Sequence, residues 1–127
     1  MDCEMVSKKL KIDFKFNSKF PFNSIKFMRG CLVLNEERLK KYINLVFDAF
    51  WKEDKDITDK NVITKILEKI EINFDDFNQK IENADIKAKL KDLTTEAYKK
   101  NIFGTPTFVK SDKLFWGQDR FEFAIKK

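Results

Sequence analysis

The chain has 127 residues, of which 43% are hydrophobic and 37% are charged, and these proportions exclude a disordered tail. Lysine and arginine total 26 against 21 acids, giving a net charge of +5 without any histidine, which excludes a Ser-His-Asp triad and histidine-ligated metal within the chain. No apolar run approaches the roughly 18 residues that a membrane span needs, and we expect no signal peptide. Cys3 and Cys31 lie far apart, so we expect two free thiols in a reducing, cytoplasmic compartment.

The first 29 residues hold seven Lys or Arg against three acids. Five phenylalanines are interleaved with these lysines, namely Phe14, Phe16, Phe20, Phe22 and Phe27. Such a segment could bind single-stranded nucleic acid or an anionic membrane surface. The alternative is that the rings belong to the core and the lysines to a solvated rim. We prefer this alternative and therefore expect neither nucleic acid nor a membrane as a partner.

Residues 1–22 are predicted to be an extended N-terminal segment. Within it, residues 10–16 alternate apolar and charged side chains, which indicates either a strand or an extended connector. Residues 17–22 contain Pro21 and are predicted to be a loop.

Residues 23–102 are predicted to be a helical domain of five helices. The first is capped by Asn23 or Ser24, and the second by Asn35. The third is capped by Thr58 or Asp59, the fourth by Asn73, and the fifth by Asn83. The fifth carries an apolar stripe and ends near residue 102, two residues before Gly104.

Residues 103–127 are predicted to form two strands and a helix in place of the preceding run of helices. Residues 105–109 and 114–116 are predicted to be two strands joined by a polar hairpin turn. Gly117 ends the second strand, and residues 118–125 are predicted to form a closing helix. We expect one compact unit of a mostly helical α/β class.

Several motifs resemble one family. These are Phe-Gly-Thr-Pro-Thr-Phe at 103–108, Phe-Trp-Gly-Gln-Asp-Arg at 115–120, Val-Phe-Asp-Ala-Phe-Trp at 46–51, Phe-Pro-Phe-Asn-Ser at 20–24 and Thr-Glu-Ala at 95–97. Together they are similar to the 2-hydroxychromene-2-carboxylate isomerase and kappa-class glutathione transferase family, a DsbA-like branch of the thioredoxin fold. Gly-Gln-Asp-Arg resembles the isomerase type more closely. The resemblance implies a partial thioredoxin-like fold, in which a helical insertion domain precedes a β-hairpin and a C-terminal helix. Residues 103–127 would then form the C-terminal half of that fold.

The resemblance also implies glutathione as the cofactor and a small electrophilic or aromatic compound as the substrate. In the family, an N-terminal strand–loop–helix–strand unit carries the catalytic serine, and no such motif is found near Met1. We therefore expect a truncated form without its catalytic residue, which pairs with a complementing N-terminal fragment or forms a homodimer. The alternatives are a kappa-like transferase or a relative of thiol-disulfide oxidoreductases, and a non-catalytic helical module that binds through its basic aromatic segment.

Four residues are candidates for the cofactor site by this resemblance. Thr105 precedes Pro106, and a cis bond there would present the Thr105 backbone to glutathione in a short antiparallel ladder. Otherwise Pro106 would be trans and begin an edge strand. Gln118 and Asp119 would stand at a helix N-terminus, where free N–H groups bind a carboxylate, and Asp119 could pair with an ammonium. Alternatively, these two residues only cap the helix, and we expect Arg120 to be paired with an acid for structural reasons.

Overall fold

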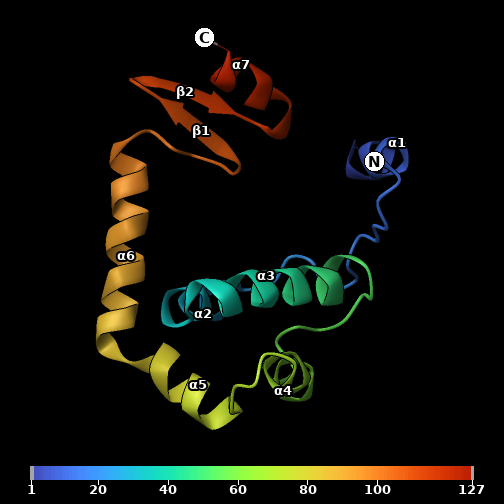
Figure 1. Ribbon diagram of the computed structural model, residues 1–127, viewed down its shortest axis with the longest axis vertical. Coiled ribbons are helices and arrows are strands. Elements are labelled where there is room, and N and C mark those ends of the chain that lie inside the picture. The colour runs from blue at the N-terminus through green and yellow to red at the C-terminus, as the bar shows by residue number, and fades with distance from the viewer. Residues whose placement is uncertain (1, 127) are drawn as a thin grey trace. The chain divides into compact units, whose positions relative to one another are not determined.

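A computed structural model describes residues 2–126, which divide into two compact units, Met1–Lys87 and Ala88–Lys127 (Figure 1). The elements, in order, are α1 (Asp2–Leu10), α2 (Ile25–Val33), α3 (Glu36–Trp51), α4 (Lys60–Glu68), α5 (Phe74–Glu82), α6 (Ala84–Lys99), β1 (Thr107–Lys110), β2 (Lys113–Trp116), the 3₁₀ turn η1 (Gln118–Arg120) and α7 (Phe121–Ile125). The sequence predicted one compact unit with divisions after residues 22 and 102. The division between the two units falls inside α6, between residues 87 and 88.

Four of the five predicted helix starts are confirmed by a capping hydrogen bond, whereas Ser24, the residue before α2, makes no such bond with its side chain. The side chain of Asn35 accepts from the Arg38 N–H at 3.0 Å, and that of Asp59 accepts from the Asn61 N–H at 2.7 Å. Asn73 accepts from two backbone N–H groups at the start of α5, and Asn83 accepts from Asp85 at 2.7 Å. Each bond satisfies a donor that the helix itself leaves unpaired, so short-range chemistry determines where these helices begin.

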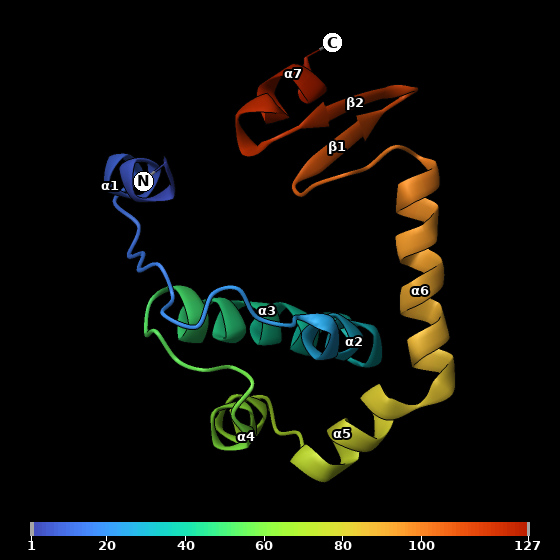
Figure 2. The ribbon, with the colours of Figure 1, turned by 180° about the vertical axis from the view of Figure 1, so that it is seen from behind.

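The sequence predicted that the N-terminal segment is extended throughout. This prediction is wrong for Asp2–Leu10, which forms α1. Acids in the first turn of α1 and lysines in its last turn complement the helix dipole. This charge pattern indicates a helix, but the prediction relied on the alternation of apolar and charged residues that begins at residue 10. The strand alternative for residues 10–16 is also wrong. After residue 11 this segment is a connector that leads from α1 to the end of α3 in Figure 2. There the Lys15 N–H donates to the Trp51 carbonyl at 2.6 Å. A helix offers no strand edge to pair with, so the alternation does not produce a sheet.

The core of the first unit lies among α2, α3, α4 and α5, with α2 packed on α3 and α5, and α4 packed on α3 and α5. Its ten buried residues are Tyr42, Val46, Ala49, Phe50, Ile57, Ile66, Leu67, Ile70, Phe77 and Ile81. Phe22 and Phe27 pack against this core as predicted. Phe16 and Phe20 do not, since each is 51% exposed.

Asn17 is the only buried polar side chain among residues 2–126, with 2% of its surface exposed. Its amide nitrogen donates to the carbonyls of Phe50, at 2.8 Å, and Lys55, at 3.1 Å. Its oxygen accepts from the Lys19 N–H at 2.7 Å. One side chain thus ties the N-terminal connector to the end of α3 and to the loop that follows.

Asp54 strengthens the same junction from the surface. Its carboxylate accepts from the Ser18 N–H at 2.7 Å and lies 2.9 Å from the Lys15 ammonium. The bond from the Ser18 backbone, followed by the bond from Lys15, lowers the pKa of Asp54 from its ordinary 3.8 to about 2.

Because folding lowers this pKa, the charged carboxylate stabilises the fold above pH 3.8, and the contribution should be lost as the pH falls toward about 2. We expect Asp54→Asn to be less stable than the wild type at pH 5, with a difference that shrinks between these two values. Urea unfolding midpoints at a series of pH values measure the difference. A difference that stays constant across this range would contradict the assignment.

The second unit contains the hairpin and the C-terminal helix. β1 and β2 are antiparallel, with Thr107 opposite Trp116 and Lys110 opposite Lys113. The predicted hairpin is confirmed, with strand bounds shifted by one or two residues. α7 packs on both strands, where Ala124 is buried and the rings of Phe108 and Phe121 lie 5.1 Å apart. α6 buries none of its residues, so its apolar stripe is not part of a core in either unit.

Candidate functional site

The four predicted site residues all belong to the second unit, and the hairpin brings their two stretches together. The Gly117 N–H donates to the Pro106 carbonyl at 3.0 Å, directly after the pair formed by Thr107 and Trp116. This bond extends the hairpin by one step beyond its strands. It therefore places the Thr105–Pro106 turn beside the residues that open η1, although twelve positions separate Thr105 from Gly117.

The Thr105–Pro106 peptide bond is cis, as the resemblance predicted. Thr105 is exposed, and within residues 2–126 its backbone N–H and carbonyl take part in no hydrogen bond. A hydrogen bond from the Thr107 hydroxyl to the Gly104 carbonyl, at 2.5 Å, stabilises the turn. A Cβ at Gly104 would lie 2.5 Å from Nε1 of Trp116, so glycine allows this indole to lie against the turn. The Thr105 backbone is thus available to a ligand.

The predicted closing helix is divided into the three-residue turn η1 and the five-residue α7. Gly117, at φ 110°, lies in a region that favours glycine, and its carbonyl accepts from the Arg120 N–H at 3.1 Å. Gln118 and Asp119, both exposed, are the first residues of this turn, where backbone N–H groups have no acceptor within the helix. Donors for a carboxylate are therefore present at the predicted place.

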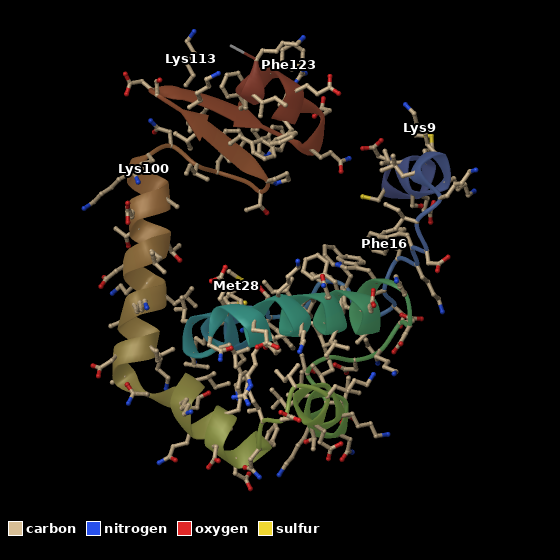
Figure 3. The ribbon with its side chains drawn as sticks, viewed as in Figure 1. Lys9, Phe16, Met28, Lys100, Lys113 and Phe123 are labelled. Atoms are coloured by element: carbon tan, nitrogen blue, oxygen red, sulfur yellow. The ribbon has the colours of Figure 1, made fainter. Side chains whose placement is uncertain are left out.

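Asp119 already has a charged neighbour. Its Oδ2 lies 3.6 Å from Nε of Arg120, and a Cβ at Gly117 would lie 2.6 Å from its Oδ1. The guanidinium of Arg120 also lies 5.6 Å from the ring centroid of Phe123, which Figure 3 labels on α7. The expectation that Arg120 pairs with an acid is confirmed. Sequence reasoning missed that this acid is Asp119, although the two residues are adjacent.

This arrangement favours a zwitterion. A carboxylate alone would be drawn to the N–H groups of η1 and repelled by Asp119 at the same turn. A ligand group that carries a carboxylate and an ammonium together can satisfy both. An α-amino acid end has this pair of charges.

The two cysteines are free, as predicted, with Cys3 exposed and Cys31 half-buried. Burial raises the pKa of the Cys31 thiol, which lowers its reactivity because the thiolate is the nucleophile. Across residues 2–126, no three Cys, Asp or Glu side chains gather in a way that could hold a metal ion. None of the helices in this range has both the length and the apolar character of a membrane span.

The first unit contains an aromatic cluster that the sequence suggested only in part. Phe14 stacks on Trp51 with ring centroids 5.6 Å apart, and Phe16 and Phe20 lie 5.9 and 6.1 Å from the same indole. Figure 3 shows Phe16 in the segment that follows α1. The phenylalanines of the basic segment are therefore divided between the core and a half-exposed surface centred on Trp51.

Known proteins resemble the chain over nearly its full length. It is 21% identical to a 2-hydroxychromene-2-carboxylate isomerase of Sphingobium xenophagum over 125 residues, which cover 96% of this chain and 62% of that protein. It is 27% identical to the uncharacterized protein YwbO of Bacillus subtilis (strain 168) over 120 residues, covering 91% and 60%. The solved structure of a 2-hydroxychromene-2-carboxylate isomerase superposes with a TM-score of 0.83 at 23% identity, covering 96% of this chain and 60% of that one.

These similarities establish the fold that the sequence predicted. The chain spans about three fifths of the length of these relatives. The profile of the DSBA-like thioredoxin domain matches residues 1–126. The hairpin, the cis bond before β1 and the helical segment ahead of them agree with that match. The chain therefore belongs to the DsbA-like thioredoxin domain family.

Proposed function

We propose that this chain contributes the γ-glutamyl-binding part of a glutathione site to an isomerase of the 2-hydroxychromene-2-carboxylate isomerase type. Two relatives with that name support the reaction class. The observation that carries the proposal is the 3.0 Å bond from the Gly117 N–H to the Pro106 carbonyl. It brings an unpaired backbone and a pair of opposite charges into one small surface.

In this proposal Thr105, Gln118 and Asp119 each bind one part of glutathione. The backbone of Thr105 pairs with the cysteinyl backbone in a short antiparallel ladder. The N–H groups of Gln118 and Asp119 receive the γ-glutamyl carboxylate, and the Asp119 side chain receives the ammonium. Pro106 adds no donor and shapes the turn that exposes Thr105.

When bound, glutathione supplies a thiolate that adds reversibly to a conjugated, small electrophilic or aromatic substrate. The chain's own role is to bind and orient the peptide so that the thiol faces that substrate. We propose that the hydroxyl that activates the thiol comes from a complementing N-terminal segment, because this sequence contains no motif like the one that carries the family's catalytic serine. Support for such a partner comes from the two-stranded sheet, whose outer edges have no strand partner among residues 2–126 and which carries the half-exposed side chains of Val109 and Trp116.

Binding can be tested with S-methylglutathione, which cannot form a disulfide with the exposed Cys3. Asp119→Asn should weaken its affinity by about 5-fold, since an exposed charge pair contributes up to about 1 kcal/mol. Isothermal titration gives the affinity, and amide NMR shifts at Thr105, Gln118 and Asp119 locate the site.

Arg120→Gln is the matched control, because it removes the cation that competes with the ligand ammonium for Asp119. It should leave the affinity unchanged or raise it. Absence of amide shifts at the three residues would overturn the proposal. So would an affinity that falls equally in both variants, because the carboxylate would then have no specific role.

A further inference from the structure

The first unit contains an open cavity of about 550 Å³ among α2, α4, α5 and the loop ahead of α4. Figure 1 shows these three helices. The lining residues that carry the argument are the cations Lys26, Arg29 and Lys60 and the apolar Phe27, Ile63 and Phe77. All of them lie within Met1–Lys87, so none belongs to the proposed glutathione site.

The lining has an excess of positive charge. Three of its side chains are cationic and none is acidic. The nearby carboxylate of Glu82 lies 3.4 Å from the Lys26 ammonium, 3.6 Å from the Arg29 guanidinium and 2.7 Å from Lys87. One carboxylate shared by three cations leaves a net positive charge at this end of the cavity.

Arg29 also has an unmet hydrogen bond. Its Nε is buried and has no hydrogen-bond partner within residues 2–126. The side chain is 19% exposed, so bulk water reaches it poorly. A buried donor without a partner costs free energy. Because this Nε has almost no accessible surface, an anion in the cavity would contact the other nitrogens of the guanidinium, within a side chain that is 19% exposed.

The rest of the wall is apolar. Phe27, Phe77 and Ile81 contribute hydrocarbon surface, and the Lys60 ammonium lies 4.8 Å from the ring centroid of Phe74. A cavity of this size with a few convergent polar groups is typical of small-molecule sites. A small inorganic anion would leave the apolar wall uncovered, whereas an organic anion could cover it.

We propose that this cavity binds an apolar organic monocarboxylate, with its carboxylate on Arg29 and Lys26 and its hydrocarbon body against the phenylalanines of α2 and α5. The body can be aliphatic or aromatic, because the wall contains both isoleucine and phenylalanine. The inference does not depend on glutathione binding, and S-methylglutathione should not displace the ligand.

The test uses decanoate and 2-naphthoate as probes, with decanol and 2-naphthylmethanol as uncharged counterparts. Titration into the full chain should shift the methyl NMR signals of Ile63 and Ile81. Each carboxylate that binds should do so at least about 10-fold more tightly than its alcohol, the equivalent of about 1.4 kcal/mol. Binding of one carboxylate alone would support the proposal and identify which body the cavity accepts.

Two variants test the role of the cations. Arg29→Gln should weaken the carboxylate about 10-fold and leave the alcohol unchanged. Lys26→Gln should act in the same direction, and its 65% exposed side chain can be replaced without disturbing the core. Lys65→Gln is the matched control, because Lys65 lies on α4 and lines a different cavity.

Three results would overturn the proposal. One is equal affinity for carboxylates and alcohols. Another is an affinity that neither the Arg29 nor the Lys26 variant changes. The third is a set of NMR shifts that leaves Ile63 and Ile81 unaffected.

Discussion

Replacing Leu67 by alanine should lower the free energy of unfolding of the first unit by about 3 kcal/mol. Leu67 has 0% of its surface exposed and belongs to the core in which α4 meets α3 and α5. The substitution removes buried methyl groups and leaves a cavity that helices on several sides cannot easily close. Urea unfolding, followed through the indole NMR signal of Trp51 in the same unit, measures the change.

Ile43→Ala is the matched control. Ile43 lies on α3 in the same unit and is 38% exposed, so water already reaches part of the removed surface. The control should cost less than about 1 kcal/mol. Equal losses in the two variants would show that Leu67 does not occupy a close-packed position.

Removal of the Asn17 side chain should have the second largest effect. Asn17→Ala leaves the carbonyls of Phe50 and Lys55 without their donor inside the protein. Each buried acceptor without a partner costs about 1–3 kcal/mol, so we expect a total loss of about 2–4 kcal/mol. The same Trp51 signal reports it, because Trp51 follows Phe50 at the end of α3.

The variant Asn17→Asp distinguishes the contribution of the Asn17 hydrogen bonds to stability from the contribution of its packing. Aspartate has nearly the same volume, but its ionised carboxylate cannot donate to either carbonyl, so this variant should also be strongly destabilised at neutral pH. Asn35→Ala is the control for loss of one exposed cap and should cost about 1 kcal/mol. A wild-type stability for Asn17→Asp would mean that packing alone explains the role of Asn17.

The starts of the helices follow from the sequence because their chemistry is local. Asn35, Asp59, Asn73 and Asn83 each accept from an N–H two or three positions ahead, so a short window of sequence contains both partners. The same holds for the hairpin, whose strands are joined by two residues. The family motifs at 103–108 and 115–120 could also be recognised without coordinates, because each is continuous in the chain.

Contacts between residues far apart in the chain determine the structural features that the sequence did not predict. The extended segment 10–16 looks like a strand until its partner is known, and that partner is the end of a helix 36 residues further on. Asn17 bonds to carbonyls 33 and 38 residues away, which no local pattern encodes. The burial of the Arg29 Nε, without a hydrogen-bond partner among residues 2–126, likewise follows only from the packing of α2 against other helices. The sequence by itself determined the family and the starts of α3, α4, α5 and α6, and it named the candidate residues for glutathione binding. The tertiary structure decided which polar groups are buried and which charges lie together, since these depend on where distant segments meet.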